Sequence, residues 1–170
     1  PVFGPERESI AATTHPVSEG HTIQLLGQVF QVMDVPGHTR GHIAYWCKSA
    51  PALFCGDTLF AAGCGRLFEG TAEQMFANMQ RLATLDGATK VYCAHEYTLG
   101  NLHFAQAVEP DNKQIAARLV EVESTRARGA CTLPSTIGLE KATNPFLRTS
   151  VPAVRAASQN HAQASIETPV

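Results

Sequence analysis

Three side chains suited to metal binding follow short apolar runs of the sequence: His38, Asp57 and His95. Each stands in a small cluster of Gly, His, Asp or Thr at a point where a strand is expected to end. Neutral imidazoles and carboxylates are ligands that zinc, iron and manganese accept, so three converging strand ends would form a metal site. Spacing alone leaves another interpretation open, because a lone histidine after a strand is usually a loop residue and Gly-Asp-Thr is a common turn.

His38 and His42 have the i, i+4 spacing that places two ligands on one helical face. Gly37, Gly41 and the β-branched and aromatic run after His42 argue against a helix here. We therefore do not interpret the pair as a helical metal motif.

The glycine-rich segment 63–71 resembles a phosphate-binding loop only superficially, because it lacks the Lys-Ser/Thr of a P-loop and the G-x-G-x-x-G of a dinucleotide site. Cys64 lies in this segment without an evident base beside it in the sequence, which disfavours a nucleophilic role. Arg66 and Tyr97 are candidates for binding an anionic substrate, since guanidinium groups hold carboxylates bidentately. The alternative for both is simple surface solvation.

Apolar periodicity indicates the elements that must position these residues. Strands are expected at 22–26, 28–35, 42–47, 51–55 and 90–94. Helices are expected between Thr71 as N-cap and Gly87, before Pro110, and around 115–122 before Gly129, with a weak helical pattern near 154–158. The sequence thus predicts an α/β fold with a β-rich first third and helices after it.

Length and composition limit the function classes. A chain of 170 residues with 44% hydrophobic residues can form one domain, or a little more, with a sizeable core. A net charge of −2 without a long basic run disfavours nucleic acid as a partner. No apolar run approaches the roughly 20 residues that cross a bilayer, and the first residues lack a secretory leader, so we expect no membrane association.

Five cysteines without a C-x-x-C pair favour free thiols in a reducing compartment. Together with the expected absence of a leader, this predicts a cytoplasmic protein.

Four motifs in order carry a family resemblance: PGHTRGHI at 36–43, FCGDTLF at 54–60, GCGRLFEGT at 63–71 and CAHEYT at 93–98. With NPFLR at 144–148, they resemble glyoxalase II, the hydroxyacylglutathione hydrolase family of the metallo-β-lactamase superfamily. The resemblance implies the second half of an αββα sandwich over residues 1–98. It implies a truncated helical substrate-binding region over 99–170.

The same resemblance implies a dinuclear site in which His38 ligates one metal, Asp57 bridges both and His95 ligates the other. The metals would be zinc, with iron or manganese as alternatives. Arg66, Phe68 and Tyr97 would lie along the glutathione-binding surface. Some relatives have Lys and Tyr at the first two of these positions, so Arg66 keeps the charge while Phe68 lacks a hydroxyl.

The implied reaction is hydrolysis of S-(2-hydroxyacyl)glutathione, such as S-D-lactoylglutathione, to glutathione and a 2-hydroxy acid, a step of methylglyoxal detoxification. A full-length member would be a monomer. Metal-activated water attacks the thioester, and a thiolate leaves readily because the pKa of a Cys-like thiol is about 8.5.

One departure limits the resemblance. Members of the family open with a half carrying T-H-x-H-x-D-H, which supplies four further ligands, and end with a helix bearing a basic pair; neither occurs here. The chain is therefore expected to be about two-thirds of a glyoxalase II, inactive alone, with apolar residues such as Phe30, Ile43 and Phe54 exposed on an uncovered sheet.

Three alternatives remain. One is another metallo-β-lactamase-type hydrolase or a glutathione persulfide dioxygenase, which uses one iron. A second is a noncatalytic fragment that binds glutathione or a partner, and a third is a plain structural domain. Four ordered motifs disfavour the third.

Overall fold

The computed structural model describes residues 1–162. Within them, a six-stranded mixed sheet has the strand order β10-β9-β6-β5-β4-β3, and two short strand pairs, β1-β2 and β7-β8, lie beside it. The strands are β1 (Phe3–Pro5), β2 (His15–Val17), β3 (Thr22–Leu25), β4 (Gln28–Asp34), β5 (Ile43–Cys47), β6 (Ala52–Gly56), β7 (Leu59–Phe60), β8 (Gly63–Cys64), β9 (Lys90–Cys93) and β10 (Ser135–Thr136).

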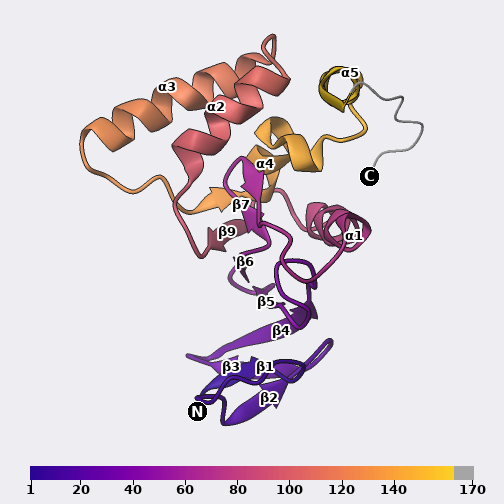
Figure 1. Ribbon diagram of the computed structural model, residues 1–170. Coiled ribbons are helices and arrows are strands. Elements are labelled where there is room, and N and C mark those ends of the chain that lie inside the picture. The colour runs from indigo at the N-terminus through magenta and orange to yellow at the C-terminus, as the bar shows by residue number, and fades with distance from the viewer. Residues whose placement is uncertain (163–170) are drawn as a thin grey trace.

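The helices are α1 (Ala72–Ala83), α2 (Thr98–Val108), α3 (Lys113–Ala127), α4 (Ile137–Thr143) and α5 (Pro152–Ala162), with a 3₁₀ turn at Pro145–Leu147. Figure 1 shows α2 to α5 at one end of the molecule, β1 to β3 at the other, and α1 beside the sheet. The α/β class and the β-rich first third are confirmed. The part of the predicted helical region beyond residue 162 lies outside the described residues.

The direction of the strands decides where their ends meet. β3, β4, β5 and β6 pair antiparallel in sequence order, and β9 pairs parallel with β6. β4, β6 and β9 therefore run in the same direction, and their carboxyl ends lie along one edge of the sheet. The loops that contain His38, Asp57 and His95 begin at that edge.

Helix α1 is the crossover that parallel pairing of β6 and β9 requires. Its N-terminus has a reciprocal capping box between Thr71 and Gln74, as the sequence indicated for Thr71. Its apolar face buries Met75, Met79 and Leu82 in the main core against the sheet. The helix ends at Ala83, four residues before the Gly87 expected to terminate it, because the chain already turns at Thr84.

The helical region has a second apolar core. α2 ends at Val108, two residues before Pro110, and α3 ends at Ala127, two residues before Gly129, both as predicted. The Asn112 cap at the start of α3 was not predicted. The facing sides of α2 and α3 bury Leu102, Ala105, Ile115, Leu119 and Val122 with Ala62. Ala62 belongs to the turn between β7 and β8, so this core joins the helices to the sheet.

A buried ion pair strengthens that junction. Arg118 of α3 donates to Glu140 of α4 at 2.7 Å, and both side chains are almost completely buried. The second oxygen of Glu140 accepts from the backbone N–H of Ala62 at 2.7 Å and from Asn144 at 2.9 Å. Asn144 in turn donates to the carbonyl of Gly63 at 2.9 Å. The β7–β8 turn is thus held by residues of the helical region.

The exposure of apolar side chains on the uncovered sheet face differs partly from the prediction. Phe54 is 41% exposed, as predicted, but Phe30 and Ile43 are half-buried. The reason is the β1–β2 ribbon, which the sequence pattern did not indicate and which packs Phe3 and Val17 against them. An apolar cavity of about 440 Å³ remains between the ribbon and Phe54.

All five cysteines are free thiols, which agrees with the sequence analysis. Among residues 1–162, none of the helices has the length and apolar character needed to cross a bilayer.

Candidate functional site

Asp57 lies between His38 and His95. Its Oδ1 is 3.2 Å from Nε2 of His95, and its Oδ2 is 3.8 Å from Nε2 of His38. The Asp57 and His38 side chains are about one-fifth exposed, whereas that of His95 is half exposed. The three predicted residues therefore converge, and each oxygen of one carboxylate faces a different imidazole.

The two distances are close to those expected between ligands of one metal. An imidazole nitrogen and a carboxylate oxygen that bind one tetrahedral zinc at usual bond lengths are separated by roughly 3.4 Å. The distances of 3.2 and 3.8 Å lie on either side of that value. Across residues 1–162, however, no three His, Cys, Asp or Glu side chains surround a single point as a metal site. The two donor pairs share Asp57, and each supplies two ligands of the kind that zinc accepts.

Backbone conformation at the end of β6 aims Asp57 at the two imidazoles. Gly56 has φ +53°, and the pairing of β6 with β9 is irregular between Phe54 and Gly56. The backbone N–H of Asp57 donates to Nε2 of His42 at 3.0 Å. Burial lowers the pKa of His42 below its ordinary value, against the smaller opposing effect of the Asp57 carboxylate. His38 and His42 lie in a loop and not in a helix, as expected from the sequence.

The predicted substrate residues on the His38 side gather around its ring. Nδ1 of His38 is 2.8 Å from the carbonyl oxygen of Arg66. The ring of Phe68 packs edge-on against His38 with centroids 5.0 Å apart, and the Arg66 guanidinium lies 5.5 Å from the Phe68 ring centroid. Phe68 is 65% exposed, so this surface faces solvent.

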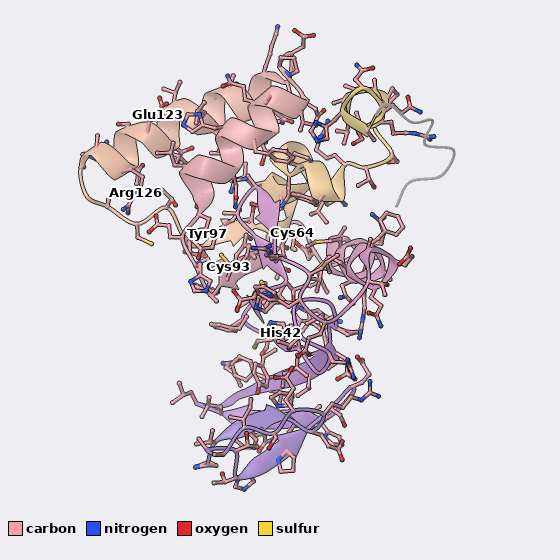
Figure 2. The ribbon with its side chains drawn as sticks, in the orientation of Figure 1. His42, Cys64, Cys93, Tyr97, Glu123 and Arg126 are labelled. Atoms are coloured by element: carbon pink, nitrogen blue, oxygen red, sulfur yellow. The ribbon has the colours of Figure 1, made fainter. Side chains whose placement is uncertain are left out.

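Tyr97 occupies the corresponding position on the His95 side. Its ring stacks on His95 at a centroid distance of 5.1 Å, and the buried Phe60 packs edge-on against Tyr97 at 5.5 Å. Tyr97 is itself 54% exposed. In Figure 2 the Tyr97 label lies close to that of Cys93, near the junction of the sheet with the helices.

Glu96 anchors the turn between His95 and Tyr97 to the chain beyond α3. Its carboxylate accepts from the backbone N–H and the hydroxyl of Thr132, both at 2.7 Å, and from Arg126 at 3.2 Å. The hydrogen bonds from Thr132 hold the pKa of Glu96 below its usual range. This clamp ties two predicted site residues to the helical region.

Cys64 has the character of a structural thiol. Burial raises its pKa to about 12, so almost none is thiolate at neutral pH. This agrees with the rejection of Cys64 as a nucleophile.

Two residues with roles at the site were not identified from the sequence. His42 contacts the Asp57 backbone, and Phe60 supports the stacked rings of His95 and Tyr97. Both lie within motifs that the sequence analysis quoted, but only the tertiary contacts distinguish them from their neighbours.

Two protein-family models match the chain, and the boundary between them falls in the turn between His95 and Tyr97. Residues 3–95 match the model of the metallo-beta-lactamase superfamily, and residues 96–168 match that of the hydroxyacylglutathione hydrolase C-terminus. The chain belongs to the hydroxyacylglutathione hydrolase family of the metallo-beta-lactamase superfamily. The sequence resemblance is thereby confirmed.

Curated relatives carry the same name. Hydroxyacylglutathione hydrolase of Ectopseudomonas mendocina is 56% identical over 167 residues, which cover 98% of this chain and 65% of the relative. That of Nitrosomonas europaea is 49% identical over 172 residues, covering 100% of this chain and 65% of the relative. The chain thus spans about 65% of the length of these relatives.

Solved structures support the fold. ETHE1 from Myxococcus xanthus matches 99% of this chain and 60% of its own, with a TM-score of 0.61 at 24% identity. TTHA1623, solved in a di-iron-bound form, matches 78% of this chain and 48% of its own, with a TM-score of 0.51 at 29% identity.

Proposed function

We propose that this chain provides the second metal-binding half and the substrate-binding region of a glyoxalase II. The complete enzyme would hydrolyse S-(2-hydroxyacyl)glutathione, such as S-D-lactoylglutathione, to glutathione and a 2-hydroxy acid. The observation that carries the proposal is the placement of Asp57, whose two oxygens face Nε2 of His38 and Nε2 of His95. We further propose that residues 1–98 form a partial metallo-β-lactamase domain and that a helical region begins at residue 99.

In this proposal His38 and His95 would each hold one of two divalent metals, and Asp57 would be shared between them. A carboxylate suits that position because its two oxygens bind separate cations and offset their mutual repulsion. Zinc is the metal we propose, with iron or manganese as alternatives. When bound, such metals activate water and polarise the thioester carbonyl.

The exposed side chains next to the two imidazoles would bind the substrate. Arg66 offers a guanidinium for a carboxylate of glutathione, and Tyr97 offers a hydroxyl. Phe68 adds an apolar surface beside His38. These groups flank the centre on two sides, so a bound glutathione thioester would extend across Asp57.

The first test is metal binding by the 170-residue chain. Zinc bound at equilibrium is measured by dialysis against a fixed free zinc concentration and elemental analysis for the wild type, Asp57→Ala and the control His103→Leu, whose ring is exposed on α2. We expect weak, incomplete binding by the wild type and the control, and loss in Asp57→Ala. Equal zinc in all three proteins would contradict the proposed centre.

The second test is turnover. The chain alone lacks T-H-x-H-x-D-H, and we expect negligible hydrolysis of S-D-lactoylglutathione by it. A chimera joined to the segment of a relative that bears this motif should hydrolyse the thioester. Glutathione persulfide oxidation, assayed in parallel, should stay at background, and the opposite result would favour the dioxygenase.

A further inference from the structure

We propose that His42 is a positioning residue. It fixes Asp57 between the two imidazoles by accepting a hydrogen bond from the backbone N–H of Asp57. The claim about the hydrogen bond stands on the geometry alone. The claim that it supports metal binding rests on the function proposed above.

The hydrogen bond links the two chain segments just beyond the last paired residues of β5 and β6, Tyr45 and Phe54. His42 is the last loop residue before β5, and Asp57 is the first residue after β6. Nε2 of His42 accepts from the N–H of Asp57 at 3.0 Å. Since a backbone N–H can only donate, Nε2 must be unprotonated, which places the ring proton on Nδ1.

Gly56 and the imidazole fit each other. A Cβ added at Gly56 would lie 2.5 Å from Nε2 of His42, so the ring occupies the space that any other side chain would need. The φ of +53° at Gly56 is also a conformation that L residues rarely adopt. The turn that orients Asp57 therefore depends on glycine at position 56 and on the His42 ring that packs against it.

His42 differs from the two neighbouring histidines in what its Nε2 faces. Nε2 of His38 and of His95 each face an oxygen of the Asp57 carboxylate. Nε2 of His42 faces the Asp57 backbone instead, with its ring edge-on to His38 at a centroid distance of 5.8 Å. The hydrogen bond between His42 and the Asp57 backbone therefore orients Asp57 without involving either carboxylate oxygen.

The test compares His42→Leu, which removes the acceptor, with His42→Gln, whose side-chain oxygen restores one, and with His103→Leu as a matched control. Exchange of the Asp57 amide proton is followed by NMR, and zinc affinity is measured by competition with a chromophoric chelator. In His42→Leu we expect Asp57 exchange to accelerate at least about tenfold and zinc affinity to fall about tenfold, the usual effect of losing an outer-shell partner. His42→Gln should recover most of both, and His103→Leu should match the wild type.

The tautomer of His42 in the unaltered protein gives a reading that does not depend on any variant folding. Ring ¹⁵N shifts should show Nδ1 protonated and Nε2 unprotonated at neutral pH. A proton on Nε2, or unchanged Asp57 exchange in a folded His42→Leu, would overturn the proposal. If the wild-type chain binds no zinc while the Asp57 exchange behaves as expected, the hydrogen bond stands and the metal centre of the proposed function fails.

Discussion

His38 Nδ1 lies 2.8 Å from the carbonyl oxygen of Arg66. Because a carbonyl only accepts, Nδ1 must carry a proton, so in the neutral ring Nε2 is the nitrogen with the free lone pair, and it faces Asp57. The segment that presents the Arg66 side chain therefore also sets the tautomer of His38 through its backbone. Metal binding and substrate binding would depend on one loop, but on different atoms of it.

Replacing Arg66 with Ala separates these two contributions. The carbonyl is retained, so zinc binding should stay at the wild-type level. The proposed charged hydrogen bond to a glutathione carboxylate would be lost, and we expect the dissociation constant for glutathione, measured by calorimetry, to rise about tenfold, or about 1.4 kcal/mol. Arg66→Lys should recover part of the affinity. Loss of zinc in Arg66→Ala would instead show that the guanidinium supports the centre.

Gly65→Ala should destabilise the protein, because its added Cβ would lie 1.7 Å from the carbonyl oxygen of Asp57. Backbone cannot move away as a flexible side chain does, and we expect the free energy of unfolding to fall by about 3 kcal/mol in urea. Gly100→Ala is the matched control. Nothing lies within 4 Å of its Cβ and it is inside α2, so that change should stabilise by about 0.5–1 kcal/mol. Equal stability of the two variants would contradict this.

The elements that the sequence predicted well are those with strong local signals. The strands from β3 to β6 and β9, and helices α1 to α3, lie within a few residues of their predicted ranges because periodicity, capping and proline act locally. β1, β2, β7, β8 and β10 were missed, since strands of two or three residues carry too short a pattern and are defined by their partners. The seven-residue helix α4 was also not predicted. The half-burial of Phe30 and Ile43 follows from the omission of β1 and β2.

At the site, strand-end clusters were sufficient to nominate His38, Asp57 and His95, because strands of like direction bring such clusters to one edge. The role of His42 was not predictable in this way. Its i, i+4 spacing from His38 has meaning only in a helix, whereas its real partner is the backbone of a residue 15 positions away. Because every residue except proline has a backbone N–H, such a hydrogen-bond partner cannot be identified from residue types.

Arg118→Met tests the ion pair that joins the helical region to the β7–β8 turn. Glu140 would remain completely buried without its cation, and we expect the free energy of unfolding to fall by about 3–5 kcal/mol. Arg126→Met is the control, since Arg126 pairs with Glu96 at a partly exposed position and its loss should cost within about 1 kcal/mol. Urea denaturation measures the free energy of unfolding of both variants. Similar losses would mean that burial does not determine how much an ion pair contributes to stability.

Glu19→Gln tests the pH dependence of the contact between α1 and the segment before β3. Arg81 donates to both carboxylate oxygens of Glu19, at 2.6 and 2.8 Å, and these bonds hold the pKa of Glu19 below its ordinary value. A carboxyl whose pKa is lower in the folded than in the unfolded state adds stability above its unfolded pKa of about 4.3. That stability disappears as the pH falls through the lower, folded pKa.

The stability difference between wild type and Glu19→Gln should therefore be constant from pH 7 to 5 and shrink toward pH 3. We expect less than about 1 kcal/mol at pH 7, because both side chains are more than 40% exposed. Urea denaturation at pH 3, 4, 5 and 7 measures it, with Glu123→Gln as a control on the exposed surface of α3 (Figure 2). A difference that widens on acidification would contradict the assignment, because it would require Glu19 to bind its proton more tightly in the folded protein than in the unfolded chain.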